Sequence, residues 1–214
     1  MVVDHQAVGS SPISHPRKFR FNLAFAIIQL VSEKIKEQIT ALSRVLDEIP
    51  ELKFLGDHVL RTPTEEVSVE EGKEIGKQLG KTLIKYRNVT GFGRGLAAPQ
   101  IGISKSVFVT FVEDVVETYI NPKITHKSEE TNLYRELCLS SGVMWADVKR
   151  SAEIELEWMD ENGEMHKEKF NGMMARLLQH EEAHLRGVVS LDEALPGTIE
   201  IVTTNPLDEV FRES

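Results

Sequence analysis

The stretch QHEEAHLRG (residues 179–187) contains an H-E-x-x-H pattern and ends on Gly187. Apolar residues precede the pattern, so the sequence predicts a helix over about 171–186 that ends at this glycine. Positions i and i+4 of a helix lie on one face, which places His180 next to His184. Their imidazoles can therefore bind one metal ion, and we favour this interpretation over two unrelated histidines on a polar helix face.

Glu181 follows His180 on the predicted helix, where its carboxylate can reach a water held by the metal. It is placed to act as a general base and then as a general acid. A catalytic metal of this kind usually has three protein ligands, so one ligand is missing. The extended peptidase pattern H-E-x-x-H-x-x-G-x-x-H does not supply it, because Ser190 stands at its third histidine. Glu200 and Glu209 are alternative ligands further along the chain.

Cys138, the only cysteine, offers an upstream ligand within the stretch ELCLS (136–140). A thiolate with two imidazoles makes a borderline-soft site that suits zinc or iron. The competing interpretation is a small buried core residue, which is the commoner role of a lone cysteine. One cysteine allows no intrachain disulfide, which is typical of a protein from a reducing compartment.

The glycine-rich stretch GRGLAAPQ (93–100) is a third candidate segment. A predicted helix precedes it and a predicted strand follows it, the reverse of the order in a dinucleotide-binding fingerprint, so we exclude that function. Its small residues let the backbone approach a ligand closely. The side-chain amide of Gln100 can stabilise an oxyanion beside a metal, or it can satisfy backbone groups of its own loop.

Taken in chain order, GRGLAAPQ, ELCLS and QHEEAH resemble the three signature motifs of peptide deformylases. The likeness runs from about Phe54 to about Leu195 and covers roughly two thirds of the chain. The resemblance implies a metal-dependent hydrolase that removes the formyl group from N-formylmethionine at the N-terminus of nascent polypeptides. It also implies a small α+β fold in which antiparallel β-sheets surround the helix that carries the H-E-x-x-H pattern.

The same resemblance assigns roles to individual residues. One divalent metal ion, ferrous iron in this family and replaceable by zinc, nickel or cobalt, would be held by three ligands: Cys138, His180 and His184. Proton transfer would depend on Glu181, and the oxyanion would be stabilised by the Gln100 side chain and the Leu139 backbone N–H. The residues expected to line the substrate groove are Gly93, Gly95, Leu96, Glu136 and Leu137.

Two positions depart from the family pattern. Leu137 stands where the family has glycine, so we expect a reshaped groove and an altered choice of substrate. Ala183 stands where the family has aspartate, and losing a carboxylate beside metal ligands typically costs about 10–100-fold in metal affinity or activity. The sequence thus leaves two alternatives to a deformylase: an H-E-x-x-H metallopeptidase, or a non-catalytic metal-binding relative that acts as an interaction module.

The remaining pattern favours an α+β fold with antiparallel sheets. Long helices are expected over about 23–48 and 68–87, where apolar residues recur at three- and four-residue steps. Strands are expected at 106–112 and 152–160, and an Asn-Gly turn then leads into the second strand of a hairpin. The glycine-rich stretch is predicted as a loop, and the C-terminal segment as irregular chain with at most one short strand.

Residues 1–50, a polar arm and an amphipathic helix, are expected to extend a catalytic domain of residues 51–214. The helix either packs on its own domain or mediates dimerisation, so we expect a monomer or a dimer through it. The net charge of −9 excludes a large nucleic-acid patch, so a ribosome would be contacted only transiently. The sequence contains no membrane span, and we expect a cytoplasmic enzyme, with an organellar location as the alternative.

Overall fold

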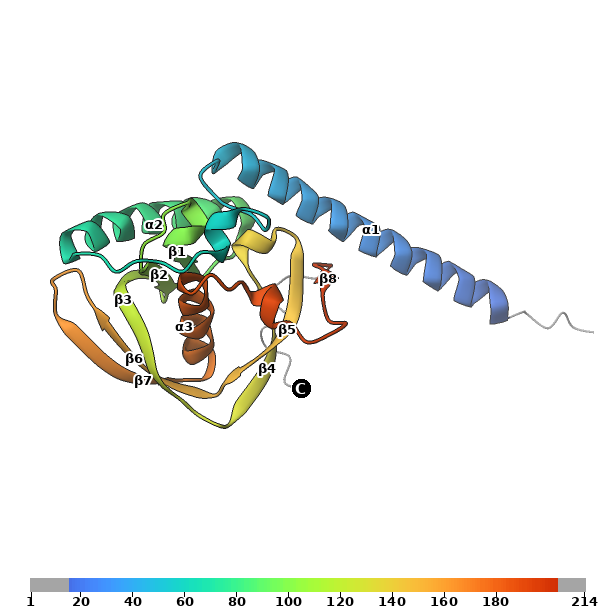
Figure 1. The fold of residues 1–214 in the computed structure, drawn as a ribbon. Coiled ribbons are helices and arrows are strands. Elements are labelled where there is room, and N and C mark those ends of the chain that lie inside the picture. Colours follow the sequence, from blue (N-terminus) through green and yellow to red (C-terminus); the bar gives the residue numbers. More distant parts are fainter. Residues whose placement is uncertain (1–15, 204–214) are drawn as a thin grey trace, which may run out of the picture.

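The computed structural model describes residues 16–203, and Figure 1 shows its arrangement. The three α-helices of this range are α1 (Pro16–Glu48), α2 (Val69–Thr90) and α3 (Gly172–Leu185). The strands are β1 (Gly95–Ala97), β2 (Val107–Val112), β3 (Val115–Lys127), β4 (Thr131–Leu137), β5 (Met144–Ser151), β6 (Glu153–Met159), β7 (Met165–Asn171) and β8 (Glu200–Ile201). Four short 3-10 helices join them: η1 (His58–Arg61), η2 (Ala98–Ile101), η3 (Leu139–Ser141) and η4 (Ser190–Glu193).

Two antiparallel sheets enclose α3. One sheet has the strand order β1-β2-β3-β6-β7 and the other has the order β4-β5-β8. Helix α3 contacts all five strands of the first sheet and β5 of the second, and Figure 1 shows it lying between the sheets. The predicted α+β fold with antiparallel sheets is therefore confirmed.

Helix α2 covers the outer face of the larger sheet, and glycines let it lie close to β3. A Cβ atom added at Gly76 would stand 2.7 Å from Oγ1 of Thr118, and one added at Gly72 would stand 2.7 Å from Ile120. Leu79 and Leu83 of α2 are fully buried in the main core. The helix thus fixes the position of β2, β3 and the edge strand β1, all of which it contacts.

Helix α1 begins at Pro16, earlier than the predicted start at about residue 23. Only its C-terminal part packs against the body, where Val45 and the following Ile49 are buried in the main core. The remainder projects away from both sheets (Figure 1). Within residues 16–203, no helix combines the length and the apolar character that crossing a bilayer requires.

The sequence prediction missed the strands β3, β4 and β5 and the short strand β1. The long strand β3 bends at Asn121, whose φ of 50° interrupts the alternation of inward and outward side chains. Strands β4 and β5 bury charged residues, including Glu136 and Arg150, so their pattern does not alternate cleanly. The glycine-rich loop prediction was wrong for residues 95–97, which form β1 by pairing with β2.

Candidate active site

Cys138, His180 and His184 come together from two elements. Cys138 follows the last residue of β4, and both histidines project from the same face of α3. The Cys138 Sγ atom lies 3.2 Å from Nε2 of His184, and the three candidate ligand atoms lie within 4.8 Å of one another. Cys138 and His184 are fully buried, and the His180 side chain is 11% exposed.

The charge of this cluster suits a metal ion. Burial alone raises the pKa of the Cys138 thiol, but the adjacent His184 and His180 outweigh burial and hold that pKa well below its usual value. A lowered pKa favours the thiolate, the form in which cysteine binds metals. One thiolate and two imidazoles within reach of a single point match a site with three protein ligands and an open position.

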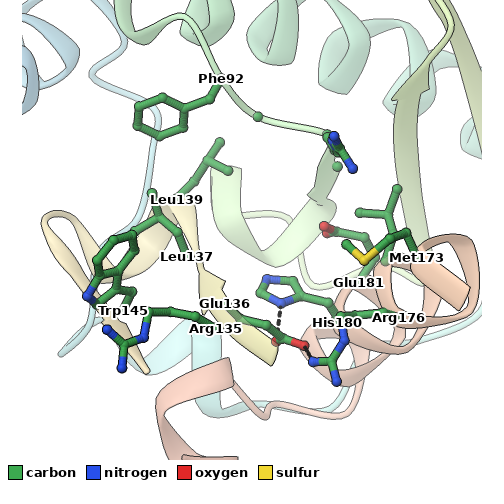
Figure 2. A pocket seen from close by; sticks show the side chains of 14 residues that line it. Phe92, Arg135, Glu136, Leu137, Leu139, Trp145, Met173, Arg176, His180 and Glu181 are labelled. Carbon is green, nitrogen blue, oxygen red and sulfur yellow. Dashed lines mark hydrogen bonds and ion pairs between the residues drawn. The ribbon is translucent and has the colours of Figure 1, made fainter. Parts of the chain in front are cut away.

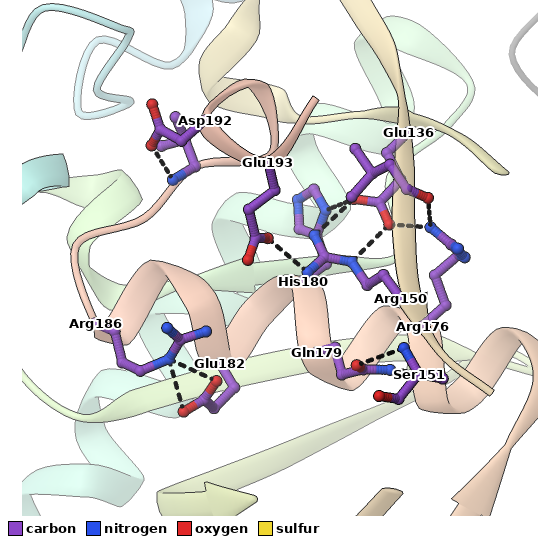
Figure 3. A network of polar contacts seen from close by, with 12 residues as sticks. Glu136, Arg150, Ser151, Arg176, Gln179, His180, Glu182, Arg186, Asp192 and Glu193 are labelled. Atoms are coloured by element: carbon purple, nitrogen blue, oxygen red, sulfur yellow. Dashed lines mark hydrogen bonds and ion pairs between the residues drawn. The ribbon is translucent and has the colours of Figure 1, made fainter. Parts of the chain in front are cut away.

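A buried ionic network orients His180 (Figure 3). The Glu136 carboxylate contacts His180 Nδ1 at 2.9 Å and accepts two hydrogen bonds from Arg150 at 2.7 and 2.8 Å. Arg176 donates to the same carboxylate. Although burial raises the pKa of Glu136, the hydrogen bonds from Arg150 and His180 lower it far below its usual value. A carboxylate on Nδ1 fixes the tautomer of His180 and leaves Nε2 as the metal-binding nitrogen.

His184 has no such partner. Its Nδ1 atom is buried without a hydrogen bond to any described residue. Ala183, at the position where the sequence resemblance expects aspartate, is also buried and offers only a methyl group. No carboxylate of the described residues takes the place of that aspartate at His184 Nδ1.

Glu181 lies beside the ligands in a buried position. Its side chain is buried, and Oε2 has no hydrogen-bond partner among the described residues. Burial raises the pKa of Glu181 to about 7. Gly95 makes room for this carboxylate, since a Cβ atom added there would lie 2.6 Å from the Glu181 Cδ atom.

Gln100 joins the loop to the site. Its Oε1 atom accepts a hydrogen bond from the Ala97 backbone N–H at 2.8 Å. Its Nε2 atom lies 3.2 Å from Ser140 Oγ and 3.6 Å from Cys138 Sγ. The carbonyl end of the amide thus satisfies the loop, while the N–H₂ end is directed at the cluster. The Gln100 side chain can therefore satisfy a backbone group of its own loop and still offer its N–H₂ group to an oxyanion.

A cavity opens in front of Glu181 and His180 (Figure 2). Four of the five residues expected in the substrate groove line it: Gly93, Gly95, Glu136 and Leu137. The fifth, Leu96, is fully buried in the main core, and its side chain does not reach the cavity. Leu139, predicted only as an oxyanion donor, also lines the cavity. The sequence prediction did not include the remaining lining residues, which are Phe92, Arg94, Arg135, Trp145, Met173, Arg176 and Leu177.

Two of those missed residues carried a signal in the sequence. Met173 and Leu177 precede His180 by seven and three residues, so they share its helix face. Arg150 and Arg176, which hold Glu136, gave no such signal because long-range ion pairs have no fixed spacing in the chain. Of the alternative ligands, Glu200 accepts a hydrogen bond from Arg135 instead, and Glu209 lies outside the described residues.

A sequence model of a family described as polypeptide deformylase matches residues 49–198. The chain belongs to the peptide deformylase family. A peptide deformylase from Pseudothermotoga lettingae is 38% identical over 166 residues, which span 78% of this chain and 94% of that protein. One from Treponema pallidum is 42% identical over 144 residues, 66% of this chain and 86% of the relative.

Solved peptide deformylases have the same fold. The crystal structure of the Thermotoga maritima enzyme matches with a TM-score of 0.61 at 34% identity and covers 68% of this chain and 97% of the other. The Synechococcus elongatus enzyme, solved in complex with actinonin, matches with a TM-score of 0.61 at 35% identity, over 68% and 79% of the two chains. The predicted family and the predicted enzyme class, a deformylase, are confirmed.

Proposed function

We propose that this deformylase acts on N-formylmethionine at the N-terminus of nascent polypeptides and that one divalent metal ion is held by Cys138, His180 and His184. The convergence of the buried Cys138 sulfur with two imidazoles carries the proposal: the three candidate ligand atoms lie within 4.8 Å of one another, and Cys138 Sγ is 3.2 Å from His184 Nε2. Peptide deformylases are metal-dependent enzymes, and the donor set suits ferrous iron, which we propose as the native metal, as well as zinc, nickel or cobalt. When bound, the ion would supply Lewis-acid polarisation of the formyl carbonyl and lower the pKa of water.

Glu181 is the proposed proton carrier. It is the buried carboxylate next to both histidines, and its raised pKa of about 7 lies near the pH at which a general base and a general acid are both effective. We propose that it accepts a proton from the attacking water and passes the proton to the departing amine, so that formate and a free N-terminus result. No described residue makes a competing hydrogen bond to Oε2, which leaves that oxygen open for the proton.

Two donors are proposed to stabilise the oxyanion. The Gln100 N–H₂ group lies beside the Cys138 sulfur, and Leu139, which supplies a backbone N–H, lines the cavity. Donors already fixed in place by the loop need no reorganisation as negative charge develops on the formyl oxygen.

The peptide chain is proposed to lie between two edge strands. Strand β1 is at one edge of the larger sheet and β4 is at one edge of the smaller sheet, and residues of both segments line the cavity. An extended peptide can therefore pair with a free strand edge, as in other peptide-binding sites. Leu137 stands in β4 within this groove, so we propose that it restricts the side chains that the groove accepts.

The proposal also covers the extent of the catalytic unit, the cellular location and contact with the ribosome. We propose residues 51–214 as the catalytic unit, with residues 1–50 as an addition, which is supported by the family match beginning at residue 49. A cytoplasmic location would keep Cys138 reduced, and contact with the ribosome would be transient, because the net charge is −9.

The test is anaerobic reconstitution of the full chain with iron, zinc, nickel or cobalt, followed by measurement of formate released from formyl-Met peptides. We expect release with at least one metal form and loss of about a thousandfold or more in Glu181→Ala, since this variant lacks the proton carrier. Acetyl-Met peptides serve as the substrate control. Equal rates for the wild type and Glu181→Ala with every metal would overturn the assigned roles.

A further inference from the structure

The C-terminal end of helix α1 packs beside η3, the short helix that supplies one of the two proposed oxyanion donors. Val45 and Ile49 are buried in the same core cluster as Leu139, the first residue of η3. Leu42 is half-buried and lies at the other end of η3, where a Cβ atom added at Gly142 would stand 3.4 Å from the Leu42 Cδ2 atom. With 100° per residue, positions 42, 45 and 49 fall within about 60° around the helix axis, so one side of α1 faces this region.

The chain that follows α1 contacts both loops that carry the donors. Lys53 donates its backbone N–H to the Gln100 carbonyl oxygen at 2.8 Å. Two residues later, Leu55 donates its backbone N–H to the Ser140 carbonyl oxygen at 3.0 Å. Gln100 belongs to η2 and Ser140 to η3, so one short segment ties the two loops together. The separation of the two oxyanion donors therefore depends on where this segment leaves α1.

Helix α2 anchors the same end of α1. The Thr82 hydroxyl donates to the Glu51 carboxylate at 3.2 Å, and the Lys85 ammonium group donates to the backbone carbonyl of Glu48. Glu48 is the last residue of α1, so this cation satisfies one of the carbonyl groups that a helix leaves unpaired at its end. The end of α1 is thus held by α2 as well as by the two loops.

Helix η3 needs support from its neighbours. It has three residues, and 3-10 helices have poorer hydrogen-bond geometry than α-helices. Leu139 lines the cavity and also belongs to the core cluster that contains Val45 and Ile49. A donor stabilises an oxyanion only while it is fixed in place, and misplacement by about 1 Å costs on the order of 100-fold in rate. The packing of α1 on the core side of Leu139 can therefore affect the chemistry.

We propose that the last two turns of α1 position the oxyanion donors, with Leu42 as the main positioning residue. The proposal rests on the functions proposed above for Leu139 and Gln100. None of the described α1 residues lines the cavity, so the helix acts through η3 and does not touch the substrate. Leu42 and Val45 also precede residues 49–198, the part of the chain that matches the family model. The added N-terminal segment thus contributes to the site.

The first test measures formate release from formyl-Met peptides by the full chain reconstituted with its most active metal. Leu42→Ala should lower kcat by roughly tenfold with little change in KM, because a displaced donor weakens binding of the transition state alone. Leu42→Met keeps most of the side-chain volume and should restore kcat. Leu46→Ala is the matched control, because Leu46 is a leucine one turn further along α1 and is 51% exposed. The charge-transfer band of the cobalt-substituted protein should be unchanged in all three variants, since α1 supplies no proposed ligand.

The second test separates positioning from a general loss of stability. In Leu42→Ala, the backbone amides of residues 138–142 should exchange with deuterium at least about tenfold faster, while those of α3 exchange as in the wild type. Ile154→Ala truncates a buried side chain in a separate core cluster. This variant should lower the free energy of unfolding, measured in urea, and leave kcat unchanged.

Three outcomes would contradict the positioning role. An unchanged kcat in Leu42→Ala beside an active wild type would overturn this proposal and leave the proposed function in place. An equal fall of kcat in Ile154→Ala, or loss of the cobalt band in Leu42→Ala, would also overturn it. A wild type that releases no formate with any of the metals would overturn both proposals.

Discussion

Gly95 shows how one residue without a side chain sets up the proposed chemistry. The Glu181 carboxylate occupies the space where a Cβ atom of residue 95 would stand. Glu181 in turn has no hydrogen bond from described residues to hold Oε2, so packing against Gly95 defines its position. The sequence indicated that small residues here admit a ligand, but it did not reveal that the closest neighbour is a side chain of the same protein.

Gly95→Ala should therefore lower kcat with little change in KM. The added methyl group displaces the Glu181 carboxylate, and a shift of about 1 Å in a catalytic group costs on the order of 100-fold in rate. Steady-state formate release measures both constants. Gly93→Ala is a poor control because φ of Gly93 is +122°, so a conservative change at the cavity wall, Leu177→Met, is the better one. An unchanged kcat with a raised KM would show that Gly95 acts on the peptide instead.

The raised pKa of Glu181 predicts a pH-dependent stability for the metal-free protein. The pKa is about 7 in the folded state and near 4.5 in the unfolded chain, so the folded state retains its proton to a higher pH. Stability is then fully present below pH 4.5 and is lost as pH rises toward 7. Glu181→Gln removes this loss and should become more stable than the wild type by up to roughly 3 kcal/mol at pH 7.

Urea unfolding of both metal-free proteins at several pH values measures this difference. The free energies of unfolding should converge near pH 4.5 and separate as the pH rises. A stability difference that stays constant across this range would contradict a buried, protonated Glu181.

The close contact between α2 and β3 predicts that a larger residue at Gly76 destabilises the fold. Gly76→Ala places a methyl group against the β-branched Thr118, with Oγ1 at 2.7 Å and Cβ at 3.2 Å. Overpacking of this kind typically costs about 1–3 kcal/mol, although alanine is the better helix former. Gly80→Ala is the matched control, because its methyl group would meet Val116 only at 3.2 Å.

We expect urea unfolding to rank Gly76→Ala below the wild type, and Gly80→Ala near or above it. Equal effects of the two substitutions would mean that α2 does not lie as close to β3 at Gly76 as described.

Elements with a regular period were predictable, and elements with interruptions were not. Helix α2 and the β6–β7 hairpin carry clear helical or alternating patterns, and the structure has them within three residues of the predicted ends. Strand β3 is interrupted at Asn121, and β4 and β5 bury Glu136 and Arg150 as an ion pair. These features arise from contacts between distant segments, which local periodicity does not report.

For the whole molecule, the same distinction explains which site residues the sequence could identify. The two histidines and Glu181 share one helix, so their spacing alone indicated a common site. Cys138 is 46 residues from His184 and was one of several candidate third ligands until the resemblance favoured it. The fold brings it to the histidines through the end of β4 and leaves Glu200 beside Arg135.

The most direct measurement of this site is the absorption spectrum of the cobalt-substituted protein, prepared without oxygen. A cysteine thiolate bound to cobalt gives an intense charge-transfer band in the near ultraviolet. We predict this band in the wild type and in Glu200→Gln, and its loss in Cys138→Ser, because Cys138 is the proposed third ligand. A band that persists in Cys138→Ser, or a wild-type cobalt complex without the band, would contradict a metal held by Cys138, His180 and His184.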